Sequence, residues 1–179
     1  MSHFLARPAA TEYAPYYERY VSRIAPGHNP LELLRTQPAQ LRQLLAPLTE
    51  AQAAQAYAPG KWTLKEMLGH QIDTERIFAY RALRIARGDQ TALPGFEQDD
   101  YVPASGANRR PLADILHEYD TVRAATLSLL ESLRPEALEH AGTASNNPVS
   151  VRALAYILAG HESHHLHILQ ERYLPVLAG

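Results

Sequence analysis

Residues 150–173, SVRALAYILAGHESHHLHILQERY, combine the apolar repeat of a helix with four histidines in seven positions. Apolar side chains recur three and four residues apart, which is the pattern of an amphipathic α-helix. Ser150 is a favoured N-cap residue, and Pro175 predicts where the helix ends. His161 and His165 are one turn apart on the apolar stripe, so their imidazoles can point at a single atom.

A third imidazole comes from a second predicted helix, Thr63–Arg87, whose inner stripe contains His70. We predict that His70, His161 and His165 bind one divalent transition metal, with zinc and nickel as first choices, because imidazole suits both. Three nitrogen ligands leave a coordination position open, which is typical of a catalytic site. Two alternatives stay open. The histidines could form a solvated helix face, or His164 could replace His165, since it lies three residues after His161.

The composition excludes several classes of function. The 179 residues are 46% hydrophobic, which is enough for one core, so we expect a single domain over residues 1–179. The formal net charge of −2, without a run of either sign, argues against a nucleic-acid groove or a polybasic membrane anchor. No apolar run could span a bilayer and no signal peptide is recognisable, so we expect a soluble cytoplasmic protein. The chain has no cysteine, so any thiol must come from the substrate.

Helical periodicity also dominates the rest of the chain, and no segment shows the alternating pattern of a strand. The repeat is clearest in Pro111–Leu133, where proline suits the first helical turn. In the second predicted helix, Thr63 and Glu66 form a capping box, and Gly88 is suited to follow the C-terminus.

The N-terminal part of the chain is more broken. Tyrosines spaced as on a helix face indicate one helix over residues 13–24, which prolines and a glycine interrupt at residues 25–30. A leucine stripe then follows over residues 31–48, with Pro38 inside it. We expect at least one kink or break in this part of the chain.

Four amphipathic segments predict an all-α fold, a four-helix bundle. His70 lies about seven residues from the start of its helix, and the midpoint of His161 and His165 about ten residues before the end of theirs. The histidines therefore differ in height by about 4–5 Å if the second and fourth helices are antiparallel, and by nearly twice that if they are parallel. The antiparallel arrangement requires a long crossover between the second and third helices, and Asp89–Arg110 is long enough to supply it.

Two carboxylates near His70 could orient its ring by accepting the N–H that faces away from the metal. Glu66 lies one turn before His70, although capping alone explains it. Asp73 lies three residues after His70 and has no basic residue four positions on, so both a supporting role and a surface role stay open.

Arg81 shares a helix face with His70, so its guanidinium should point into the bundle. It could bind an anionic substrate group, or it could pair with a buried carboxylate such as Asp114 or Glu118. No catalytic residue is assigned, with Arg81 and Asp73 as supporting candidates only. Residues 95–101 of the crossover could rim a pocket or be solvated surface, and Trp62 is interpreted as a packing anchor.

Several of these motifs together resemble a known family. They are Lys61-Trp62-Thr63, the run from Gly69 to Arg76, Ala79-Tyr80-Arg81, the run from Gly160 to His165, and Glu171-Arg172-Tyr173-Leu174. In these motifs the chain resembles the DinB-like metal-binding four-helix bundles. Within that family it most resembles the branch of bacillithiol transferases and metal-dependent hydrolases. The resemblance implies an up-down-down-up bundle, often a homodimer, with a metal on the histidines that match His70, His161 and His165.

The function expected on this basis is that of a metal-dependent transferase or hydrolase, in first place a thiol S-transferase. The metal would activate a low-molecular-weight thiol, or a water, for attack on an electrophilic small molecule. The alternative is a non-catalytic metal- or ligand-binding bundle that acts in a stress response. A pocket that opens onto the metal and is lined by polar groups would favour the enzyme.

Overall fold

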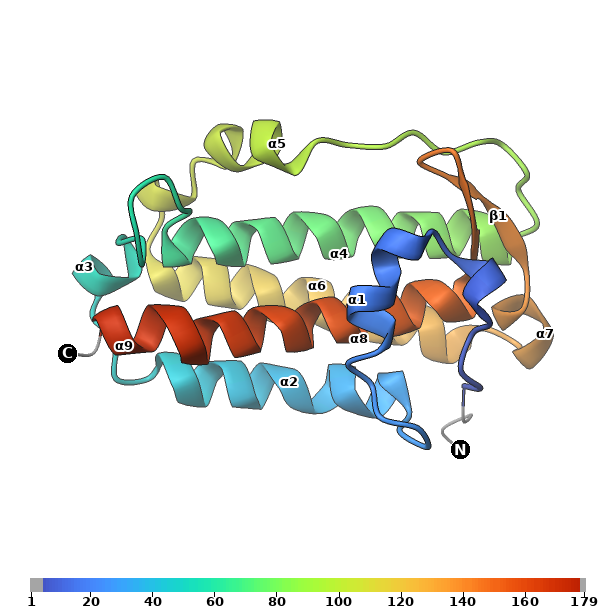
Figure 1. Cartoon of the computed structure of the whole chain (residues 1–179), viewed down its shortest axis with the longest axis horizontal. Helices are drawn as coiled ribbons and strands as arrows, with labels where there is room; N and C mark the ends of the chain where they lie inside the picture. The colour runs from blue at the N-terminus through green and yellow to red at the C-terminus, as the bar shows by residue number, and fades with distance from the viewer. Residues whose placement is uncertain (1–4, 178–179) are drawn as a thin grey trace.

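Four long helices lie side by side in the computed structural model, which describes residues 5–177 (Figure 1). They are α2 (Pro30–Leu45), α4 (Leu64–Ala86), α6 (Leu112–Ser132) and α8 (Val151–Ile168). Helix α4 packs against both α6 and α8, and α2 packs against the other side of the same two helices. The predicted four-helix bundle is confirmed. None of the helices within residues 5–177 is long and apolar enough to cross a membrane.

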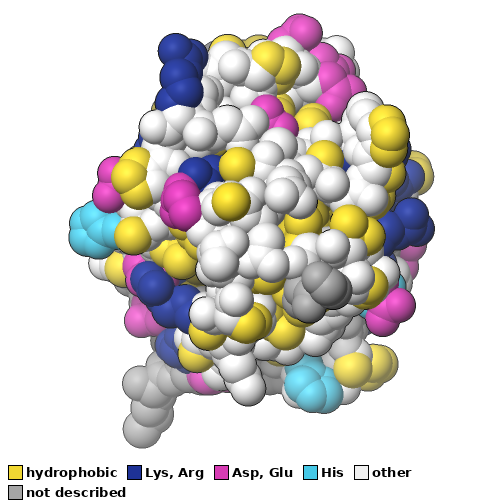
Figure 2. Space-filling view, turned by 90° about the vertical axis from the view of Figure 1, so that its left-hand side faces the viewer, with side chains coloured by type: hydrophobic (Ala, Val, Ile, Leu, Met, Phe, Trp, Pro, Cys, Tyr) yellow, Lys and Arg dark blue, Asp and Glu magenta, His cyan; other side chains and the backbone are white. Residues whose placement is uncertain are grey.

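Short elements connect the long helices and continue the last one. They are the 3-10 turns η1 (Ala10–Glu12), η2 (Pro15–Tyr17) and η3 (Ala107–Arg109), the helices α1 (Glu18–Val21), α3 (Glu50–Ala53), α5 (Gln98–Ser105), α7 (Pro135–Leu138) and α9 (Leu174–Leu177), the π-helical turn η4 (Leu169–Tyr173), and the strands β1 (Ala141–Ala144) and β2 (Asn147–Ser150). The end of the bundle at which α4 begins carries intermixed hydrophobic and charged side chains of both signs (Figure 2).

Helices α4 and α8 run in opposite directions, whereas α4 and α6 run in the same direction (Figure 1). The chain leaves the end of α4 and returns along the bundle to the end at which α4 began. Near the start of this path, the backbone N–H of Leu93 donates to the carbonyl of Thr143 over 2.9 Å. Near its end, the Asn108 side chain donates to Glu66 in the first turn of α4 over 2.9 Å. This path brings His70 to the level of the histidines of α8.

Local signals place several helix ends where the sequence predicts them. The Thr63 side chain accepts from the N–H of Glu66, and the Glu66 carboxylate accepts from the N–H of Thr63, which is the expected capping box. Gly88 follows α4 with a φ of 81°. Ser150 caps α8 by accepting from the N–H of Ala153 over 3.1 Å.

Three predictions about secondary structure were wrong. Residues 141–150 form an antiparallel hairpin, whose strands are too short to show an alternating pattern in the sequence. The two strands are joined by a turn in which Ser145 and Asn146 have positive φ. The tyrosine-rich segment forms short turns and α1 in place of one helix. Pro175 does not end the last helix, which continues as α9. The π-helical turn η4 just before it changes the pairing of backbone N–H and carbonyl groups, and this accommodates a residue that has no N–H.

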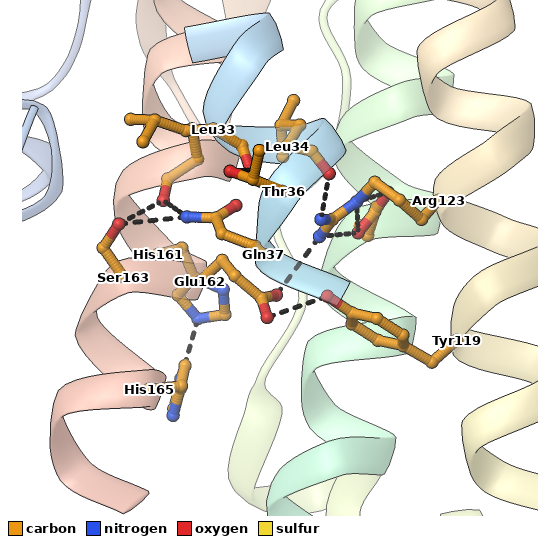
Figure 3. Close-up of polar contacts among 12 residues, drawn as sticks. Leu33, Leu34, Thr36, Gln37, Tyr119, Arg123, His161, Glu162, Ser163 and His165 are labelled. Carbon is orange, nitrogen blue, oxygen red and sulfur yellow. Dashed lines mark hydrogen bonds and ion pairs between the residues drawn. The ribbon is translucent and has the colours of Figure 1, made fainter. Parts of the chain in front are cut away.

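Helix α2 runs through Pro38 without interruption. A proline has no N–H, so the carbonyl four residues earlier, that of Leu34, loses its donor within the helix. The guanidinium of Arg123 replaces this donor, with Nη1 donating to Leu34 O over 3.0 Å (Figure 3). A side chain from α6 therefore permits the proline in α2.

Arg123 is also the centre of a buried ion network that joins all four long helices. Its Nε and Nη2 donate to the Glu75 carboxylate of α4 over 2.8–3.1 Å, and Nη2 donates to Glu162 of α8 over 3.1 Å. The hydroxyl of Tyr119 donates to Glu162 over 2.8 Å (Figure 3). Burial raises the pKa of Glu162, whereas the Arg123 cation and the Tyr119 hydroxyl oppose that rise. The carboxylates and the guanidinium therefore depend on one another for charge compensation.

Replacing Arg123 by methionine should destabilise the protein by about 3–5 kcal/mol, because Glu75 and Glu162 would stay buried without a cation. Urea unfolding followed by circular dichroism measures this loss. Arg76→Met is the matched control, since Arg76 pairs with Glu118 at the surface. That variant should lose less than about 1 kcal/mol. Equal losses in the two variants would contradict the assigned role of the network.

Gly160 is the point at which α1 lies directly on α8. A Cβ at this position would come within 2.1 Å of the carbonyl oxygen of Tyr20, which is backbone and cannot rotate away. Gly160→Ala should therefore cost about 1–3 kcal/mol of stability and displace α1. Gly69→Ala is the control, because Gly69 also lies inside a long helix, α4. A Cβ at Gly69 would lie at an ordinary contact distance of 3.5 Å from Ala107. Thermal unfolding should show the control at or above the wild-type midpoint.

Candidate metal centre

Three imidazoles converge inside the bundle, His70 from α4 and His161 and His165 from α8. The Nε2 atoms of His70 and His161 are 3.1 Å apart, and those of His165 and His161 are 3.0 Å apart. The side chains are buried, with exposed fractions of 5–7%. One ligand atom from each residue lies within 4.8 Å of the other two. The structure thus brings together the three histidines that the sequence predicts to form one site.

The donor set fits a single divalent metal. Nitrogens bound tetrahedrally to one zinc at about 2.0–2.1 Å would lie roughly 3.3–3.4 Å from one another, which is close to the 3.0–3.1 Å spacing of the two measured Nε2 pairs. The rings would then carry their protons on Nδ1. Near Nδ1 of His70 lies the Thr74 hydroxyl, at 3.5 Å. Nδ1 of His165 is buried and has no hydrogen-bond partner within residues 5–177.

All three rings are held in the neutral form that binds metal. Burial, together with the nearby His164, lowers the pKa of His70 to about 4. Burial also lowers the pKa of His161 and His165 well below the ordinary value, and the neighbouring histidines add to the effect. At neutral pH each ring therefore offers a lone pair without losing a proton first.

Two cavities reach the histidines. The larger, of about 410 Å³, meets His70 and His165 and is lined by side chains that include Trp62, Arg19 and Lys61. The smaller, of about 290 Å³, meets His70 and His161. Tyr16, Tyr20 and Gln98 line both cavities. Two adjoining cavities therefore reach the histidine cluster.

Aromatic side chains surround the cluster. The Trp62 ring lies 4.8 Å from the ring of His70, so it lines the site as well as packing near the helix end. Tyr20 presents an edge-on ring 5.1 Å from that of His161. The spacing of the tyrosines over residues 13–24 predicts only a helical stripe for Tyr20, since nothing along the chain indicates that α1 folds back over α8.

The other candidate residues lie outside the three-histidine group. Glu66 caps α4, as its simpler interpretation predicts. Asp73 is half-buried, burial raises its pKa, and within the described part of the chain it makes no hydrogen bond to His70. His164 is half-buried beside His165, with ring centres 5.2 Å apart, and it lines the larger cavity outside the three-histidine group.

Arg81 is buried as predicted, and of the two alternatives for its charge, the pairing with Asp114 or Glu118 does not occur within residues 5–177. Glu118 instead binds Arg76 and Arg110, which reach it from the surface. Arg81 lines neither histidine cavity. Residues 95–101 do contribute to these cavities, through Phe96, Glu97, Gln98 and Asp99.

Acid should destabilise the metal-free protein through these histidines. The unfolded chain binds protons below about pH 6.5, whereas folded His70 stays neutral until about pH 4. The free energy of unfolding should therefore fall, as the pH drops through this window, by up to about 1.4 kcal/mol per pH unit for each histidine. Urea unfolding of chelator-treated protein at several pH values measures the slope. His161→Gln should reduce it, and replacement of the exposed His117 should not.

Comparison with known proteins agrees with this architecture. The sequence profile of the DinB superfamily matches residues 33–169. Among solved structures, the chain is similar to YfiT from Bacillus subtilis, a probable metal-dependent hydrolase with an unusual four-helix bundle topology. The TM-score is 0.73 at 14% sequence identity, over 93% of this chain and 90% of YfiT. A comparison with curated protein sequences gives no match. Because the superfamily profile covers most of the chain, including all three converging histidines, this protein belongs to the DinB superfamily.

Proposed function

We propose that this protein is a metal-dependent enzyme in which His70, His161 and His165 hold one divalent transition metal. The observation that carries the proposal is the convergence of three buried, neutral imidazoles at a point that two cavities reach. When bound, such a metal lowers the pKa of a thiol or water ligand and so makes a nucleophile available near neutral pH. The reaction proposed is the transfer of a low-molecular-weight thiol, or of water, to an electrophilic small molecule.

The side chains of the larger cavity support an anionic reactant. Arg19 and Lys61 line it from different segments, and neither forms an ion pair with another described residue. The guanidinium of Arg19 instead lies 4.2 Å from the centre of the Tyr16 ring. Asp99 is the one carboxylate among the residues that line this cavity. The local charge therefore favours a thiol or an electrophile that bears a negative group.

The second candidate function is that of a non-catalytic metal- or ligand-binding bundle. A closed coordination sphere would support it, because a structural metal needs no access for a substrate. The two cavities at the histidines favour the enzyme. A homodimer stays a prediction from the family resemblance.

An activity screen tests the enzyme directly. The protein, loaded in turn with zinc or nickel, would be incubated with cysteine or glutathione together with an aryl halide, an epoxide or an aryl ester. Turnover that chelation abolishes and metal restores would support the proposal. Turnover in metal-free protein, or a competent covalent adduct on a protein side chain seen by mass spectrometry, would contradict it.

Substitution of the histidines tests the ligand set. His70→Ala, His161→Ala and His165→Ala should each lose most of the bound metal, because two imidazoles hold a divalent ion much less tightly than three. Elemental analysis of protein equilibrated with zinc and then desalted measures the stoichiometry. His164→Ala is the matched control and should keep nearly normal metal. A loss in that variant as large as in His165→Ala would exchange the two assignments.

A further inference from the structure

We infer that Arg81 forms the base of a second binding site, separate from the histidines, which takes a small organic monocarboxylate with a flat apolar body. Arg81 follows His70 by eleven residues on α4, which places the two positions about 16 Å apart along the helix. It lines a cavity of about 290 Å³ that contains none of the three histidines. The inference is independent of the function proposed for the metal centre.

The charge of Arg81 is buried without a compensating carboxylate. Only 3% of the residue is exposed, and within residues 5–177 no acidic side chain lies within ion-pair distance of it. Nη2 donates to two neutral acceptors, the carbonyl of Pro94 over 2.8 Å and the hydroxyl of Ser145 over 3.1 Å. Hydrogen bonds to neutral groups satisfy donors but leave the charge uncompensated, which is costly in a low-dielectric interior. Arg123, the other buried arginine, has two carboxylates.

The cavity is preformed around this guanidinium. The Leu93 N–H donates to Thr143 O over 2.9 Å, and the Ser145 N–H donates to Leu93 O over 3.0 Å, so the crossover is fixed to the hairpin turn. Residues 93–96 form one wall of the cavity, and Ile77 of α4 forms part of another. A ligand would therefore find the site without first ordering a loop.

The lining defines the chemical class of the ligand. Phe96 lies close to Arg81, with the guanidinium carbon 5.9 Å from the ring centre. Tyr80 and Tyr101 line the cavity although they are 50% and 46% exposed, and large exposed aromatic side chains are typical of binding sites. The other arginine on the lining, Arg76, is already paired with Glu118. The buried positive charge of Arg81 among apolar walls matches one carboxylate on an aromatic body.

Benzoate and its uncharged analogue benzamide are the probes. In a ¹⁵N–¹H NMR titration of the protein as purified, millimolar benzoate should saturably shift the amides of residues 77–81 and those of Leu93, Gly95 and Phe96. The signal of Trp62, the only tryptophan, reports on the histidine cavity and should move little. Benzamide should bind at least tenfold more weakly, because it cannot compensate the guanidinium.

Variants separate a binding role from a structural one. Arg81→Gln should weaken benzoate at least tenfold, and Arg81→Lys, which keeps the charge, should weaken it less. Arg87→Gln removes an exposed arginine of the same helix end and should leave the affinity within twofold of wild type. If Arg81→Gln does not fold, Ile77→Phe, which fills the cavity and keeps the guanidinium, should abolish the benzoate shifts.

Three results would overturn the inference. They are the absence of saturable shifts in wild-type protein, equal shifts with benzoate and benzamide, and shifts centred on Trp62. A loss of stability in Arg81→Gln without benzoate binding to the wild type would show that Arg81 only ties the crossover to the hairpin.

Discussion

The buried guanidinium of Arg123 is the interaction on which the arrangement of the bundle depends. It binds Glu75 of α4, Glu162 of α8 and the Leu34 carbonyl of α2 from its own position on α6. Removing any partner would leave a buried charge or a buried carbonyl unsatisfied, so the geometry of the four helices is specified together. A core of leucines alone would tolerate helices sliding by a turn, whereas this network permits one register.

That register determines where the three histidines meet. Glu162 follows His161 directly on α8, and Glu75 lies five residues after His70 on α4. The same two helices that Arg123 joins therefore supply all three imidazoles. Burial keeps the rings neutral, and the open cavities beside them admit small molecules. The buried ion pairs of Arg123 and the three neutral histidines therefore lie next to each other along α4 and α8.

The crossover lines cavities in addition to connecting two helices, and the hairpin holds it in place. The return path along the bundle supplies Phe96 and Gln98 to the cavities at the histidines. The hairpin turn at Ser145 holds the crossover in place through backbone hydrogen bonds and through Arg81. The two kinds of cavity share Phe96 as a common wall. The proposed small-molecule site and the proposed metal centre would therefore share part of one connecting segment.

The sequence by itself determined the features that depend on local chemistry. Helical periodicity identified the four long helices, the capping box placed the start of α4, and the i,i+4 spacing of His161 and His165 with His70 on an inner stripe predicted the metal site. Only the tertiary structure decided that Arg123 pairs with Glu75 and Glu162, that Tyr20 covers His161, and that Arg81 contacts Pro94 and Ser145. Such contacts join residues 13 to 141 positions apart, so their partners are selected by packing and not by a regular spacing along the chain.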